Sequence, residues 1–131
     1  MNRTKAREYA FILLFEYRFQ PDEIESILSG FIEEYKPGSQ TEYIEKVVRG
    51  VVSNVKEIDE RIENAAKGWS AERISCVCSA VLRLAVFEMT QCADIPEAVS
   101  VNEAVALAKK YDGEEAAPFV NGVLGGMAGK K

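Results

Sequence analysis

The sequence contains no histidine, so the chain has neither an imidazole metal ligand nor an imidazole general base. Its three cysteines, Cys76, Cys78 and Cys92, are odd in number, which disfavours a disulfide framework and fits a reducing compartment. Positions 76 and 78 would lie about 200° apart around a helix, so a shared metal is not expected. No activated-nucleophile pattern is present either, and an unusual carboxylate pair is the one catalytic alternative that stays open. We expect no cofactor, no metal and no catalytic residue.

Long apolar runs are also lacking, since none approaches the roughly 18 residues of a membrane span. The first 20 residues begin with basic side chains and show no cleavage-type pattern of small residues. We therefore expect a cytoplasmic protein. The 131 residues are 47% hydrophobic and 28% charged, which is ordinary for a globular chain and predicts a single domain over residues 1–131.

Positive charge is scarce and unevenly placed. The formal net charge of −5 argues against binding of polyanions by the whole surface. Arg3, Lys5 and Arg7, however, precede every acidic residue. Between residues 22 and 45 the balance reverses, with Lys36 against seven acids: Asp22, Glu23, Glu25, Glu33, Glu34, Glu42 and Glu45. The sequence predicts a basic tip on an acidic body.

Apolar residues recur at intervals of three and four along the whole chain, which predicts an all-α fold of about seven helices. Asn2 or Thr4 can cap the first helix, Asn54 the fourth and Ser70 the fifth, while Gly68 can end the fourth with a left-handed residue. The expected ranges are 2–19, 21–36, 41–52, 54–68, 70–89, 100–112 and 114–124.

The helix expected at 70–89 is apolar around nearly its whole circumference, which places it in the middle of the fold. Leu82, Leu84 and Ala85 are interpreted as core residues. Arg83 and Glu88 are its charges, and each should find a partner or reach solvent.

The last two helices form a predicted hairpin. Ser100 and Glu103 have the spacing of a capping box, which would start the first of them, and Asp112-Gly113 would end it. Asn121-Gly122 lies between two apolar pairs and is also typical of a β-hairpin turn. The local sequence leaves both structures open.

Three segments carry a resemblance to the NusB family of bacterial transcription antitermination factors. The pair VNEAVALAKKY and FVNGVL is similar to the family's C-terminal signatures, which are helical. ERISCVCSAVLRLAVFEM resembles the family's ER and LRLA core, and RTKARE followed by YAFILLFEY resembles its arginine-rich opening helix. The resemblance implies a compact bundle of two packed helical sub-bundles.

The resemblance also implies a function. The family's basic helix contacts single-stranded boxA RNA of nascent ribosomal RNA transcripts, and by residue match Arg3, Lys5 and Arg7 inherit that role. The departures are Thr4, at an often basic position, and Phe15, where a tyrosine is frequent.

A small-subunit ribosomal protein, NusE, is the protein partner that the resemblance implies. Glu72 and Glu115 match acidic positions of the NusE surface, whereas Cys78 does not match. The pair would join the RNA polymerase antitermination complex. Some family members form homodimers, so a second copy of the chain is a further candidate partner.

Other interpretations of the same residues are open. Judged by its residues alone, RTKARE is more simply a solvated helix start than an RNA site. The chain would then be a helical protein-interaction or dimerisation module without RNA binding. Similar helical domains also occur fused to ribosomal RNA cytosine methyltransferases, but no cofactor fold or catalytic cysteine motif is present here.

Overall fold

The computed structural model describes residues 1–69 and 74–128. The segments whose apolar residues recur at intervals of three and four are helical along nearly the whole chain. The α-helices are α1 (Arg3–Phe19), α2 (Ile24–Tyr35), α3 (Thr41–Ser53), α4 (Val55–Ala65), α5 (Cys76–Gln91), α6 (Glu97–Asp112) and α7 (Ala116–Met127). Two short 3-10 helices, Pro21–Glu23 and Gly38–Gln40, precede α2 and α3. The described ranges contain no strand, and the all-α prediction is confirmed.

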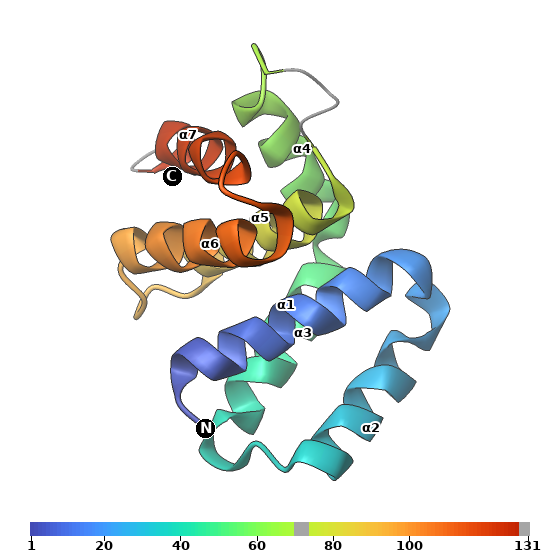
Figure 1. Ribbon diagram of the computed structural model, residues 1–131. Coiled ribbons are helices and arrows are strands. Elements are labelled where there is room, and N and C mark those ends of the chain that lie inside the picture. Colours follow the sequence, from blue (N-terminus) through green and yellow to red (C-terminus); the bar gives the residue numbers. More distant parts are fainter. Residues whose placement is uncertain (70–73, 129–131) are drawn as a thin grey trace.

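The helices form the two packed sub-bundles that were expected. Helices α1 to α3 make one group and α4 to α7 the other, and Figure 1 shows the first group in blue to teal below and the second in green to red above. Helix α5 contacts α1 and α3 as well as α4, α6 and α7, so it is shared by both groups. The N-terminal end of α1 thereby lies beside α6, far from it in sequence.

The central position of α5 follows from its composition. Val81, Leu82 and Val86 are completely buried, and Leu84 and Ala85 are 2% exposed. Arg83 reaches α4, where two hydrogen bonds of 2.9 Å join its guanidinium to the Asp59 carboxylate. Both charges of α5 therefore have partners, because Glu88 is held by three other helices as described below.

The starts of α5 and α6 differ from the prediction. Helix α6 begins at Glu97, one turn earlier than the Ser100–Glu103 capping box would place it. The capping-box assignment is wrong because the Ser100 hydroxyl and the Glu103 carboxylate bond to other helices. For α5, the expected start at Ser70 lies outside the described residues, and Ile74 and Ser75 are not helical. The helix begins at Cys76, and Ser75 caps it because its Oγ accepts a hydrogen bond from the Cys78 N–H.

Helix α4 begins directly after Asn54, the expected N-cap residue, but the Asn54 side chain does not cap the helix. Its Nδ2 instead donates to the Gly50 carbonyl of the preceding helix, at 2.8 Å. Gly68 has a φ of 94°, as expected for a left-handed residue after the helix.

The β-hairpin alternative at Asn121-Gly122 is wrong, because both residues lie inside α7. Phe119, Val120, Val123 and Leu124 are completely buried, and only helical spacing brings all four to one face. A Cβ on Gly122 would stand 2.8 Å from the Trp69 ring, so this glycine gives the indole its place against α7.

Candidate nucleic-acid interface

The N-terminal turn of α1 presents the first two predicted cations to solvent. Asn2 caps the helix, since its Oδ1 accepts from the Lys5 N–H at 2.8 Å. The first turn has no acidic residue, and Arg3, Thr4 and Lys5 are exposed. Cations at a helix start oppose the helix dipole by a few tenths of a kcal/mol, so their presence here is not explained by helix stability.

Arg3 is held over an aromatic ring. Its guanidinium carbon lies 4.1 Å from the centroid of the Tyr43 ring, and its Nε donates to Gln40 Oε1 at 2.7 Å. Within the described residues the other N–H groups of Arg3 have no hydrogen-bond acceptor. A guanidinium fixed on a ring face with free donors is suited to forked contacts with phosphate oxygens.

Lys5 is less constrained. Its side chain is 51% exposed, and its Nζ lies 3.3 Å from Glu8 Oε1 and 5.2 Å from the centroid of the Tyr9 ring. An exposed ion pair of this kind contributes under about 1 kcal/mol, so Lys5 can exchange it for another anion at little cost.

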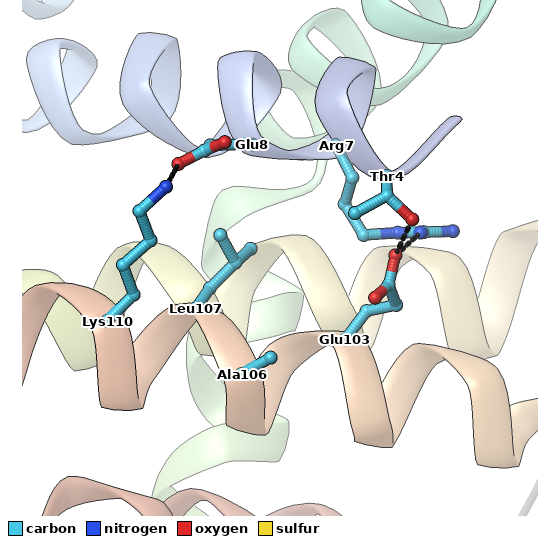
Figure 2. Close-up of a pocket in the computed structure, with 7 residues that line it drawn as sticks. All are labelled: Thr4, Arg7, Glu8, Glu103, Ala106, Leu107 and Lys110. Carbon is cyan, nitrogen blue, oxygen red and sulfur yellow. Dashed lines mark hydrogen bonds and ion pairs between the residues drawn. The ribbon is translucent and has the colours of Figure 1, made fainter. Parts of the chain in front are cut away.

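Arg7 does not project into solvent, and the expectation that it emerges from an exposed helix start is wrong. The residue is only 4% exposed. Its Nε donates to Glu88 Oε2 at 2.7 Å, and one terminal nitrogen donates to Glu103 Oε1 at 2.5 Å. Figure 2 shows Glu103 reaching from α6 toward both Thr4 and Arg7, and the Thr4 hydroxyl donates to the same Glu103 oxygen at 2.8 Å.

The Glu88 carboxylate is the centre of this buried cluster. It is 1% exposed, and its Oε2 accepts from Arg7 and from the Tyr43 hydroxyl. Its Oε1 accepts from the Ser100 hydroxyl at 2.8 Å. One carboxylate of α5 thus joins α1, α3 and α6, and we call these four residues the Glu88 cluster.

Electrostatics within the Glu88 cluster keep Arg7 charged and the Tyr43 phenol protonated. Burial alone lowers the pKa of Arg7, but the hydrogen bond to Glu88 and the nearby charges more than offset it, and the net pKa is raised. Burial first, and then the Glu88 charge, raise the pKa of Tyr43 far above its ordinary value. The phenol therefore stays protonated and keeps donating to Glu88.

A second set of charges surrounds Glu8 on the same side of α1. Glu8 Oε2 accepts from Lys110 Nζ at 2.6 Å and from the Tyr111 hydroxyl at 2.5 Å, and Figure 2 shows the long Lys110 side chain reaching up from α6. These two hydrogen bonds are the main reason why the pKa of Glu8 falls from 4.5 to about 2. The exposed cations Lys5 and Lys110 therefore share one carboxylate.

Between the two sets lies a small pocket of about 140 Å³. Its charged lining residues are Arg7, Glu8, Glu103 and Lys110, all paired with one another or with neighbouring groups. The pocket is a seam between α1 and α6, and its charged side chains are already engaged by one another or by their neighbours. No group of His, Cys, Asp and Glu that could hold a metal ion occurs in residues 1–69 and 74–128.

Of the two acidic residues expected to contact a protein partner, the structure describes Glu115. Glu115 is exposed and immediately precedes α7. Glu72 lies outside the described residues. Cys78 is buried, its thiol is hydrogen-bonded to Asp112 Oδ2 at 3.4 Å, and burial raises its pKa. Cys78 therefore belongs to the interior and does not present its thiol to a partner.

Comparison with known proteins identifies the family. The NusB family model matches residues 4–129. The chain belongs to the NusB family. A transcription antitermination protein NusB from Acetivibrio thermocellus is 46% identical over 126 residues, covering 95% of this chain and 87% of the relative. The NusB protein of Clostridium botulinum is 39% identical over 142 residues, covering 97% and 99%.

Solved NusB structures share the fold. T. maritima NusB superposes with a TM-score of 0.89 at 35% identity, covering 99% of this chain and 92% of the other. The antitermination factors NusB and NusE in complex with double-stranded RNA give 0.81 at 31% identity, covering 95% and 96%. Membership of the NusB family makes the chain a transcription antitermination factor and not an enzyme. No helix in the described ranges is long and apolar enough to cross a membrane.

Several residues that shape the candidate interface were missed by sequence reasoning. Tyr43 supports Arg3, while Lys110 and Tyr111 extend the surface beside Lys5. A signal existed for one of them, because Lys110 lies in the basic last turn of α6. No local pattern indicated that this turn would lie against the start of α1.

Proposed function

We propose that this NusB-family chain binds single-stranded boxA RNA of nascent ribosomal RNA transcripts together with NusE, and that the pair joins the RNA polymerase antitermination complex in the cytoplasm. The observation that carries the proposal is the similarity, over 95% of the chain, to a NusB that was solved with NusE and RNA. The exposed cations at the start of α1 support it chemically, because phosphates are the anions that such a tip attracts.

In this proposal Arg3 and Lys5 contact phosphates directly. Arg7 acts from the interior, where it ties the start of α1 to α5 and α6 and so fixes the direction in which Arg3 and Lys5 point. Lys110, whose side chain is 61% exposed, adds a third cation beside Lys5. The proposed RNA-binding set is therefore Arg3, Lys5 and Lys110, with Arg7 as a positioning residue.

A row of aromatic side chains that begins at Tyr111, beside Lys110, offers stacking surfaces for unpaired bases. Phe11 lies between Tyr111, at 4.9 Å between ring centroids, and Phe15, at 6.4 Å. Phe19 continues the row at 5.3 Å from Phe15. Tyr111 and Phe19 are 40% and 59% exposed. Bases stacked on them would favour a single-stranded RNA over a duplex.

The test is a titration of boxA RNA, at several salt concentrations, into the chain with Arg3→Ala and Lys5→Ala combined. Loss of two phosphate contacts should weaken binding and flatten the slope of log affinity against log salt by about 1.4. The control combines Lys56→Ala and Lys67→Ala, which remove the same charge from exposed positions near α4. Equal slopes for both double variants would remove the RNA site from α1.

NusE binding is tested by cooperativity. Three exposed cations on an acidic chain supply only modest RNA affinity at physiological salt, so NusE should add nucleotide contacts of its own. Glu72 and Glu115 are the acidic residues proposed to hold this basic partner. A coupling of about 1 to 3 kcal/mol is expected when RNA is titrated into the mixture rather than into each protein alone. Equal affinity for the mixture and the better single protein would favour a plain interaction or dimerisation module.

A further inference from the structure

The flank of α1 that faces α2 carries an open groove that the RNA proposal does not use. It has a volume of about 430 Å³ and runs between the two helices. Its floor is apolar and consists of Tyr9, Ile12, Leu13, Ile27 and Phe31. Leu13 and Phe31 are buried, whereas the other three are only partly covered. Helix α2 packs mainly on α1 and lies away from α4 to α7, as Figure 1 shows, so no further helix of residues 1–69 and 74–128 closes this groove.

Three of the residues that line the groove have aromatic rings that pack against one another. Tyr9, Phe31 and Tyr35 form a triangle with ring centroids 4.8 to 5.3 Å apart. Tyr35 is 50% exposed although it belongs to this cluster. Gly30, at the middle of α2, has no side chain to cover the edge of the groove, and an added Cβ there would meet nothing within 4 Å. The groove can therefore receive side chains from outside without rearrangement of its walls.

Carboxylates flank this apolar floor on both sides. Glu16 of α1 and Glu34 of α2 line the groove. Within the described residues neither carboxylate has an ion pair or a side-chain hydrogen bond. The stretch from Phe19 to Tyr35 contains Asp22, Glu23, Glu25, Glu33 and Glu34 and no lysine or arginine. An anionic ligand such as RNA is thus repelled from this flank.

We propose that the α1–α2 groove is a docking site for a basic amphipathic helix of a protein partner. Apolar side chains at helical spacing would enter the floor between Tyr9 and Phe31, in the manner of a helix lying in a hydrophobic groove. Lysines or arginines flanking that apolar stripe would meet Glu16 on one side and Glu34 on the other, and charge complementarity would fix the orientation. The partner and an RNA held by Arg3 would occupy different flanks of α1, while Lys5 marks the end of the groove, where its Nζ lies 5.2 Å from the centroid of the Tyr9 ring.

The test uses a lactam-stapled helical peptide of about 15 residues with leucines on one face and lysines on the other, since unstapled helices of this length are marginal in water. Binding is measured by fluorescence anisotropy and mapped by amide NMR shifts on the full chain. The shifts should be confined to residues around Tyr9, Ile27 and Gly30. A peptide of the same composition with scrambled order should not bind, and a leucine–glutamate version should not bind either.

Two pairs of variants separate the groove from the rest of the surface. Gly30→Arg fills the rim and adds positive charge, and should raise the Kd at least about tenfold, whereas Gly125→Arg makes the same change at an equally open position of α7. Combined Glu16→Gln and Glu34→Gln should raise the Kd about threefold to tenfold and reduce its salt dependence. Combined Glu60→Gln and Glu63→Gln, which remove the same charge from α4, should leave it unchanged.

Several results would overturn the proposal. They are unchanged binding in Gly30→Arg, shifts on another face, or equal binding of the scrambled peptide. Concentration-dependent shifts of the groove residues without peptide would assign the groove to a second copy of this chain. Displacement of bound boxA RNA by the peptide would show that the two flanks are not separate. The peptide is measured without RNA, so the outcome of this test does not depend on whether the RNA proposal is correct.

Discussion

Both flanks of α1 carry carboxylates, but these carboxylates are used in opposite ways. On the α6 flank the charges of Arg7, Glu8 and Lys110 are all paired inside the protein, at distances of 2.5 to 2.7 Å. On the α2 flank Glu16 and Glu34 face an open groove without an internal partner among the described residues. Paired charges hold the helices together, while unpaired charges are available to another molecule.

The largest expected effect on stability comes from removing the central ion pair of the α6 flank. Arg7→Ala would leave the buried Glu88 carboxylate without its cation and should lower the free energy of unfolding by about 3 to 5 kcal/mol. Urea unfolding followed by circular dichroism measures the change. Arg3→Ala removes the same side chain type from an exposed position of the same helix and should cost under about 1 kcal/mol. Similar losses for the two variants would show that the cluster does not stabilise the fold.

A smaller effect concerns the response of the paired flank to acid. The pKa of Glu8 is about 2 in the folded chain against an ordinary 4.5, so its contribution to stability is complete above pH 4.5 and is lost as the pH falls through 2. Glu8→Gln should flatten the pH dependence of the melting temperature within this window.

The cause of the low Glu8 pKa can be tested separately. Lys110→Met removes the largest cause of the shift and should move the pKa of Glu8 upward toward 4.5, as followed by carboxyl carbon NMR. Tyr111→Phe, which removes the second hydrogen bond, should raise it by a smaller amount. A Glu8 pKa that stays near 2 in both variants would contradict this assignment.

The smallest effect sharpens the contrast on the open flank. Gly30 lies inside α2 and an added Cβ would meet nothing, so Gly30→Ala should raise the free energy of unfolding by about 0.5 to 1 kcal/mol through helix propensity alone. Gly50→Ala is the matched opposite, because its Cβ would stand 2.2 Å from a carbon of the Phe87 ring and should destabilise the chain. Destabilisation by Gly30→Ala would mean that the groove is not open at its rim.

Repeating apolar spacing was enough to predict the seven helices and the central place of α5, because that pattern reports which face of a helix is buried. Local cap motifs were less dependable. Ser100 and Glu103 match a capping box, yet both side chains are taken by groups on other helices. A motif of four residues has no information about such competitors.

In the candidate site, too, exposure could be predicted from the local sequence, whereas contacts between distant helices could not. Arg3 and Lys5 are exposed as predicted from their place in the first turn of a helix. The burial of Arg7 depends on Glu88, 81 residues away, and no spacing within the first helix could reveal it. The one available hint was the need of Glu88 for a partner in an otherwise apolar helix. The α1–α2 groove arises from how two helices diverge, which periodicity does not describe.

The Glu88 cluster has a consequence for the order in which this chain folds. Its hydrogen bonds span 81, 45 and 12 residues of sequence, so only the shortest, to Ser100, can form from neighbouring helices. A folding intermediate made of α4 to α7 would enclose a carboxylate that still lacks its guanidinium and its phenol, which is costly in a low-dielectric interior. Closing the longest loops comes late and slowly. We therefore expect the N-terminal helices to dock in one concerted final step, and a fragment without them to stay a loosely packed, fluctuating globule.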